Sequence, residues 1–196
     1  MIDAPRNIAL KSSLALATAV LLVACSSQPT LPRGMQTHSE AKEALVTVSP
    51  VGESAVSGQL QVDIFGDGIR ISGTLHGFPR QGEFAFHIRE HGDCGNDARN
   101  AGAIFNPLGS RHGRYARGEH MLGDMDNLDV DATLSTAINR GVQGLTLGGG
   151  DYTDIANRSF VIHESPDDYA TQPAGNSGRA IACGVVQVTN PPPKAG

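Results

Sequence analysis

Residues 59–75 read QLQVDIFGDGIRISGTL. In both halves of this stretch apolar and polar residues nearly alternate and β-branched residues are frequent, a pattern typical of β-strands with one buried face. Gly66-Asp67-Gly68 separates the two halves and is typical of a tight turn. The stretch therefore predicts a β-hairpin, which is an antiparallel pair of strands.

The same period-two pattern recurs on both sides of this hairpin. The further predicted strands are 44–50, 83–89, 128–134, 144–147, 158–163 and 181–189. Eight short strands favour an all-β fold, namely an antiparallel sandwich or barrel. Residues 90–127 and 164–180 lack any strand pattern and predict two long irregular loops, which in compact domains usually carry function.

Composition agrees with a turn-rich β protein and excludes some partners. The 196 residues include 24 Gly, 11 Pro and no Trp, and this length suits one domain with a sizeable core. There are 15 Lys and Arg against 20 Asp and Glu, so the formal net charge is -5. With no basic excess, nucleic acid is not an expected partner.

The N-terminal segment reads as an export signal. Arg6 and Lys11 precede an apolar run over 12–24 that is too short to span a bilayer as a helix. The run ends in LVAC at 22–25, which resembles a bacterial lipobox with Cys25 as the lipidated residue. The alternative is an ordinary secretory signal in which this cysteine is a coincidence.

These features predict three segments and a location. Residues 1–24 are expected to be a lipoprotein signal peptide, 25–42 a lipidated polar tether, and 43–196 the folded domain. The chain is then anchored in a bacterial envelope membrane through Cys25. The serine that follows resembles an outer-membrane sorting signal, and the domain is expected to lie in the periplasm.

Two cysteines, Cys94 and Cys183, remain once Cys25 is assigned to the anchor. An even pair of cysteines in an oxidising compartment predicts a disulfide bond. The alternative is two separate buried thiols.

Several histidines lie in or beside the predicted loops. His87 and His163 lie on predicted strands next to the loops, whereas His112, His120 and Asp124 lie within the first loop. Imidazole and carboxylate groups are ligands that zinc and copper accept. The pattern is compatible with a metal site, and also with histidines that are exposed or hydrogen-bonded and bind no metal.

Five motifs resemble the Cu/Zn superoxide dismutases. They are FHIREHGDC (86–94), NAGAIFNPLGSRHG (100–113), LGDMDNL (122–128), SFVIHESPDD (159–168) and GNSGRAIACGVV (175–186). Their order and spacing match the family over about 43–189. The resemblance implies an eight-stranded Greek-key β-barrel, a Cys94–Cys183 disulfide and a copper–zinc pair bridged by one imidazolate. It leaves open whether the chain forms a homodimer, since bacterial members differ in association.

On the copper side the resemblance is incomplete. His87 and His163 match two of the copper histidines. The second histidine of the F-H-x-H pattern is replaced by Arg89, and the bridging histidine of A-G-x-H-F-N-P is replaced by Ile104. A guanidinium offers only hydrogen-bond donors and an aliphatic side chain offers no lone pair, so two of four copper ligands are missing.

On the zinc side more of the pattern remains. His112 and Asp124 match a zinc histidine and the zinc aspartate. The place of the other zinc histidine is taken by Met121, with His120 one residue earlier as a substitute candidate. Asp167 matches the carboxylate that links a copper histidine to a zinc histidine, although it also suits a simple turn residue.

Arg179 is the candidate for guiding an anionic substrate. The family's arginine lies three residues before the second disulfide cysteine, where this chain has Ala180. A shift of one residue near a strand turns a side chain to the other face, so Arg179 is expected to miss the copper channel.

The sequence therefore predicts a superoxide dismutase-like lipoprotein whose dismutation is lost or strongly reduced. It would act as a binding or structural module, with at most a partial zinc site and with copper held poorly, and the sequence does not identify a protein partner. The alternative is an active dismutase, with superoxide as substrate and a rearranged ligand set that recruits His91 or His120.

Overall fold

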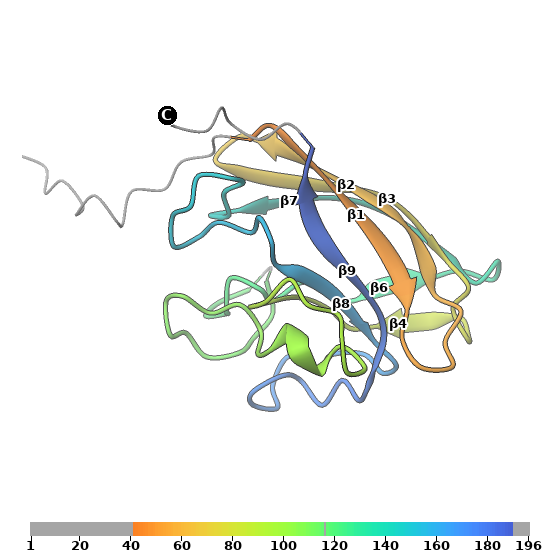
Figure 1. Ribbon diagram of the computed structural model, residues 1–196. Helices are drawn as coiled ribbons and strands as arrows, with labels where there is room; N and C mark the ends of the chain where they lie inside the picture. Colours follow the sequence, from red (N-terminus) through yellow and green to blue (C-terminus); the bar gives the residue numbers. More distant parts are fainter. Residues whose placement is uncertain (1–40, 116, 190–196) are drawn as a thin grey trace, which may run out of the picture. The chain divides into compact units, whose positions relative to one another are not determined.

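The computed structural model describes residues 41–115 and 117–189, which form β-strands and one short 3-10 turn (Figure 1). The strands are β1 (Glu43–Pro50), β2 (Ser57–Phe65), β3 (Gly68–His76), β4 (Gly82–Phe84), β5 (Phe86–Arg89), β6 (Leu128–Val130), β7 (Ser135–Gln143), β8 (Ser159–His163) and β9 (Ala180–Val188). The 3-10 turn η2 spans Arg99–Ala101. The predicted all-β class is confirmed.

Seven strands form one curved sheet in the order β5-β8-β9-β1-β2-β3-β7, and β4 pairs with β6 (Figure 1). Each of these pairings is antiparallel. The predicted hairpin is β2–β3, in which Phe65 lies opposite Gly68. β9 lies beside β1, and β7 lies beside β3, so strands that are far apart in the sequence are neighbours in the sheet. Such long connections between neighbouring strands are typical of a Greek key.

Three strand predictions need correction. The stretch 83–89 forms two strands, because β4 pairs with β6 whereas β5 pairs with β8. The stretch 128–134 is strand only to Val130. The stretch 144–147 is not a strand, and Thr146 in it forms one isolated bridge to Asp154. With β7, which was not predicted, the described residues contain nine strands instead of eight.

Strand β7 was missed because polar residues interrupt its pattern. Ile138 and Val142 are buried, but Arg140 lies between them. The guanidinium of Arg140 donates to the backbone carbonyls of Asp126 and Asn127. The donors of this inward-facing side chain are therefore satisfied by carbonyls outside the strand. A period-two hydrophobic pattern does not detect such distant acceptors.

The hydrophobic core fixes the strands that carry the histidines. Phe86 of β5 packs edge-to-face on Phe160 of β8, with 5.4 Å between ring centroids. Because successive side chains of a strand point to opposite faces, Phe86 faces the core and His87 faces the loops. Both side chains are fully buried. Core packing thus determines where His87 lies.

The two long irregular loops are present as predicted, and they contact each other. The side chain of Gln172 accepts from the backbone N–H of His112 at 3.0 Å and donates to its carbonyl at 2.9 Å. The first loop is also joined covalently to β9 by the Cys94–Cys183 disulfide. The predicted disulfide is therefore confirmed, and it ties a loop to the sheet across 89 residues of sequence.

The predicted signal peptide (1–24), the lipidated Cys25 and all but the last two residues of the predicted tether lie outside the described residues. In the part of the chain that the structure describes, no helix has the length and apolar character needed to cross a membrane.

Candidate metal centre

Three of the predicted ligand histidines converge where β5 and β8 meet the two loops. His87 lies on β5, His163 ends β8, and His112 comes from the first loop. The ring of His87 is 5.5 Å from the ring of His163 and 5.9 Å from the ring of His112, centroid to centroid. All three side chains are buried.

Asp167 of the second loop links His87 to His112. Its Oδ2 accepts from Nε2 of His87 at 2.8 Å, and its Oδ1 accepts from Nε2 of His112 at 3.0 Å. All three side chains are completely excluded from solvent. The structure thus gives Asp167 the linking position that the family resemblance implies, and such hydrogen bonds fix the orientation of both imidazole rings.

Asp124 binds the other nitrogen of His112. Its Oδ1 lies 2.7 Å from Nδ1 of His112, and its Oδ2 accepts from the backbone N–H groups of Gly113 and Met121 at 2.9 and 2.8 Å. Burial by itself lowers the pKa of His112, but the charges and hydrogen bonds of Asp124, and then of Asp167, outweigh it and raise that pKa.

His120 does not join this group. Its Nδ1 donates to the carbonyl of Gly118 at 3.0 Å, and its ring contacts the ring of Tyr115 at 5.4 Å. Among the described residues, the one set of three potential ligands within mutual reach is His87, His112 and Asp167. The prediction that His120 substitutes for the missing zinc histidine therefore has no geometric support, because the loop turns this ring outward onto Tyr115.

Zinc would find an incomplete set of donors here. A structural zinc site needs four ligands in tetrahedral geometry. His112 and Asp124 are the members of the predicted zinc set that meet, and both oxygens of Asp124 already accept hydrogen bonds. In the His87–Asp167–His112 set, both Nε2 atoms are likewise hydrogen-bonded to the carboxylate of Asp167. The residues present form at most a partial zinc site.

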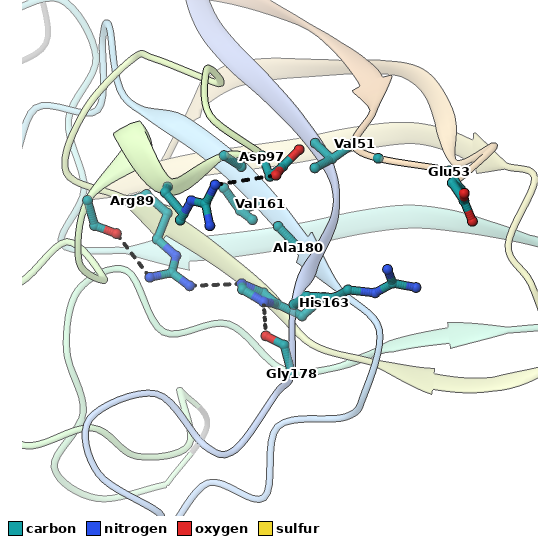
Figure 2. Close-up of a pocket in the computed structure, with 13 residues that line it drawn as sticks. Val51, Glu53, Arg89, Asp97, Val161, His163, Gly178 and Ala180 are labelled. Atoms are coloured by element: carbon teal, nitrogen blue, oxygen red, sulfur yellow. Dashed lines mark hydrogen bonds and ion pairs between the residues drawn. The ribbon is translucent and has the colours of Figure 1, made fainter.

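Arg89 occupies the place of a copper ligand and contacts the next one. Its Nη2 donates to Nε2 of His163 at 2.8 Å, and its Nη1 donates to the carbonyl of Gly102 at 3.1 Å (Figure 2). The other ring nitrogen of His163, Nδ1, donates to the carbonyl of Gly178 at 3.0 Å. The lone pair with which His163 would bind a metal is therefore directed at a guanidinium.

Electrostatics keep this imidazole neutral. Burial, followed by the positive charge of Arg89 and by the nearby imidazole of His87, lowers the pKa of His163 to about 3. A neutral ring with its proton on Nδ1 has a free lone pair on Nε2, which is the acceptor that Arg89 requires. The Arg89–His163 contact is thus a stable hydrogen bond and not a repulsion between two cations.

Ile104, at the position where the resemblance places the bridging histidine, faces the same space as Arg89. It lies opposite Arg89 in an isolated antiparallel bridge, and its side chain is 3% exposed. Residues directly opposite in such a bridge point to the same face, so positions 89 and 104 face one space. Two buried nitrogens there lack a hydrogen-bond partner, Nε of Arg89 and Nδ1 of His87, and of these only the imidazole nitrogen can offer a lone pair. One free nitrogen beside a guanidinium and an aliphatic side chain does not fit copper.

The histidine considered as a replacement ligand, His91, lies apart from this space. It is exposed, and its backbone N–H donates to Ala101. The ring lies beside Gly102, where an added Cβ would meet its Cδ2 at 2.9 Å. The structure therefore places no third histidine nitrogen with those of His87 and His163 on the copper side, among the residues it describes.

A pocket of about 820 Å³ opens on this side of the site (Figure 2). Arg89 and His163 line it, and so does Arg179. The Arg179 side chain is 74% exposed, and its Nε donates to Glu164 at 2.7 Å. Arg179 thus lines the same pocket as Arg89 and His163, and there it forms a surface ion pair with Glu164.

Two supporting residues were not singled out from the sequence. Asn127 holds the backbone of Asp167 from both sides: its side chain accepts from the Asp167 N–H at 2.9 Å and donates to the Asp167 carbonyl at 3.1 Å. Gly175 has φ +67°, and a Cβ on it would lie 1.7 Å from Oδ1 of Asp167. Both residues belong to motifs that carry the resemblance, which is the signal that could have found them.

Comparison with known proteins relates this geometry to one family. The family model described as "Copper/zinc superoxide dismutase (SODC)" matches residues 56–186. "Superoxide dismutase [Cu-Zn] 2" of Aquifex aeolicus is 32% identical over 182 residues, covering 90% of this chain and 99% of the relative. "Superoxide dismutase-like protein YojM" of Bacillus subtilis is 38% identical over 109 residues, covering 54% of this chain and 56% of the relative.

A solved structure agrees with these matches. It is the crystal structure of a double mutant of a SOD-like protein from Bacillus subtilis, in which a tyrosine and a proline are each replaced by histidine. It superposes on this chain with a TM-score of 0.66 and 32% sequence identity, covering 73% of this chain and 96% of that chain.

Proposed function

Because this chain belongs to the copper/zinc superoxide dismutase family, we propose that it is a superoxide dismutase-like protein in which dismutation is lost or strongly reduced. It acts as a binding or structural module and retains at most a partial zinc site. The observation that carries this proposal is the 2.8 Å hydrogen bond from Nη2 of Arg89 to Nε2 of His163.

Dismutation oxidises one superoxide and reduces another, so it needs a centre that changes oxidation state between the two half-reactions. In this family copper supplies that centre. Here a copper ion would have to displace the guanidinium of Arg89 from His163, beside a permanent positive charge. It would also lack a donor at Ile104. Both effects oppose copper binding.

The relatives do not decide this question by themselves. They include proteins named superoxide dismutase and a protein named superoxide dismutase-like. The residues at the ligand positions of this chain support the second kind. The double mutant with two introduced histidines matches this chain over most of its length, which supports the expectation that this fold tolerates added histidines.

A metal-loading experiment tests the proposal. The purified chain is incubated with Cu²⁺ and Zn²⁺ and desalted, and its metal content and superoxide turnover are measured beside the Aquifex aeolicus relative treated in the same way. We expect far less than one copper per chain and turnover near the uncatalysed rate. The contrast is easy to measure, because active members of this family approach the diffusion limit. One copper per chain together with fast turnover would overturn the proposal.

We also propose that the domain is held at the periplasmic face of the bacterial envelope, in the outer membrane, by lipidated Cys25. The support is the sequence: a basic start, an apolar run over 12–24 and the LVAC motif. We expect Cys25→Ala to move the protein from the membrane fraction to the soluble fraction of a bacterial host, whereas Ser26→Ala, which keeps the cysteine, remains membrane-bound. Equal membrane retention of the Cys25→Ala protein would refute the anchor.

A further inference from the structure

Arg89 is a partly buried cation with no carboxylate within ion-pair distance among the described residues. Its guanidinium donates to two neutral acceptors, the carbonyl of Gly102 and Nε2 of His163. None of the ion pairs among residues 41–115 and 117–189 includes it. Burial lowers the pKa of Arg89, while the nearby charge of Glu90 acts in the opposite direction. A charge that is partly removed from water without an opposite charge costs free energy, so an anion at this place would stabilise the protein.

The guanidinium still has donors to offer. Arginine carries five N–H groups, of which the two hydrogen bonds use one on Nη1 and one on Nη2. The N–H of Nε is buried and has no acceptor. The donors left for a ligand in the pocket are the second N–H groups of Nη1 and Nη2, which lie in one plane and match the two oxygens of a carboxylate.

The pocket of about 820 Å³ gives a ligand access to this charge. Figure 2 shows Arg89 joined to His163, with Val161 and Ala180 next to them. The pocket is lined by three arginines, two carboxylates and a group of apolar side chains. The charged residues are Arg89, Arg99, Arg179, Glu53 and Asp97, and the apolar ones are Val51, Ala98, Val161 and Ala180.

The rim arginines are already paired, which leaves Arg89 as the cation available to a ligand. Arg99 donates to Asn96 at 2.7 Å and lies 3.5 Å from Asp97, and its side chain is 69% exposed. Arg179 is paired with Glu164. A ligand with one negative charge is therefore matched, and a multiply charged anion is not.

We propose that this pocket binds the carboxylate of a small monocarboxylic acid, with Arg89 as its anchor. The carboxylate accepts from the free N–H groups of Arg89, and the short alkyl part of the acid contacts Val161 and Ala180. An inorganic anion would use the charge but leave the apolar wall uncovered. This inference rests on the proposed function, since copper bound between His87 and His163 would displace the arginine.

Butyrate is a suitable probe, and butyramide is its uncharged analogue. The ¹⁵N-labelled full chain is titrated with each at constant ionic strength, and the backbone resonances of the pocket and the Nε–H resonance of Arg89 are followed. We expect saturable shifts with butyrate and none with butyramide. Bound butyrate should also raise the melting temperature relative to an equal concentration of chloride.

Two matched variants separate the partly buried arginine from the rim. We expect Arg89→Gln to weaken butyrate binding about 10-fold or more, because hydrogen bonds to a charged group are lost. Arg99→Gln, which removes an exposed arginine of the same pocket, should change affinity by less than about 3-fold, as is usual for exposed charges. If the Arg89→Gln protein does not fold, the comparison of butyrate with butyramide on the unchanged chain still tests whether the pocket binds a carboxylate.

The inference is overturned if butyrate causes no saturable shift, if butyramide binds equally well, or if phosphate binds more tightly than butyrate. Copper content is measured in the same sample. A chain that holds stoichiometric copper would refute the proposed function itself. A copper-free chain that ignores butyrate would refute the carboxylate site and leave the loss of dismutation standing.

Discussion

Replacing Arg89 and Ile104 together by histidine is expected to raise the affinity for Cu²⁺ by at least about 100-fold, because loss of an outer-shell partner alone changes metal affinity 10–100-fold and two direct ligands are added here. Positions 87 and 89 are two apart on β5, so their side chains point to the same face. Position 104 lies opposite position 89. With His163, four imidazoles then face one space, as copper prefers.

Neither single substitution should suffice. Arg89→His frees Nε2 of His163 and removes the positive charge, but leaves an aliphatic side chain at Ile104. Ile104→His adds a metal ligand, but the guanidinium of Arg89 still donates a hydrogen bond to Nε2 of His163 at 2.8 Å. We therefore expect the two effects to be strongly non-additive, as they are for groups that share partners.

Competition with a chromogenic Cu²⁺ chelator measures the Cu²⁺ affinity of four proteins: the unchanged chain, the two single variants and the double variant. A single variant that binds copper as tightly as the double variant would show that the ligand positions are misassigned. Matched Cu²⁺ affinity of the double variant and the unchanged chain would show the same.

Loss of the Cys94–Cys183 disulfide should lower the free energy of unfolding by up to roughly 4.5 kcal/mol, the loop-entropy value for a span near 90 residues. The bond joins a long loop to β9 at a sequence separation of 89. Cys183 is 2% exposed and packs with Ala98, Ala101 and Val161, so packing is disturbed as well.

Denaturant unfolding of the Cys94→Ser/Cys183→Ser double variant measures this loss. Changing both residues avoids a free thiol, and Cys25→Ser serves as the matched control because it alters a cysteine that lies outside the described residues and outside the disulfide. The control should unfold like the unchanged chain. An unchanged unfolding midpoint in the double variant would mean that the bond does not form in the native protein.

Most of the fold could be predicted from sequence because its strands alternate. The β2–β3 hairpin and β1 follow period-two patterns with one buried face. β8 is buried at all five positions and β9 at most of its positions, so their runs of apolar residues indicated these two strands. β7 was not predicted because Arg140 lies on its inner face between two buried residues, Ile138 and Val142. The guanidinium of Arg140 donates hydrogen bonds to backbone carbonyls, which makes this inward position possible. A local pattern contains no information on such distant acceptors.

The sequence was enough to predict which residues belong to the site, but it did not predict which of them contact one another. Motif spacing identified Arg89, Ile104 and the residues around them. The hydrogen bond from Arg89 to His163 joins residues 74 apart in sequence and depends on the conformation of a long side chain. The position of His120 depends on a loop that turns it onto Tyr115, which spacing does not determine.

The central claim is that a guanidinium and an aliphatic side chain have replaced two copper ligands. Its most direct test is a crystal of the unchanged chain soaked in a cupric salt, with anomalous diffraction recorded at the copper edge. We expect no ordered ion among His87, Ile104 and His163, and Arg89 still bonded to His163. A fully occupied copper ion coordinated by both histidines, with Arg89 displaced, would contradict it.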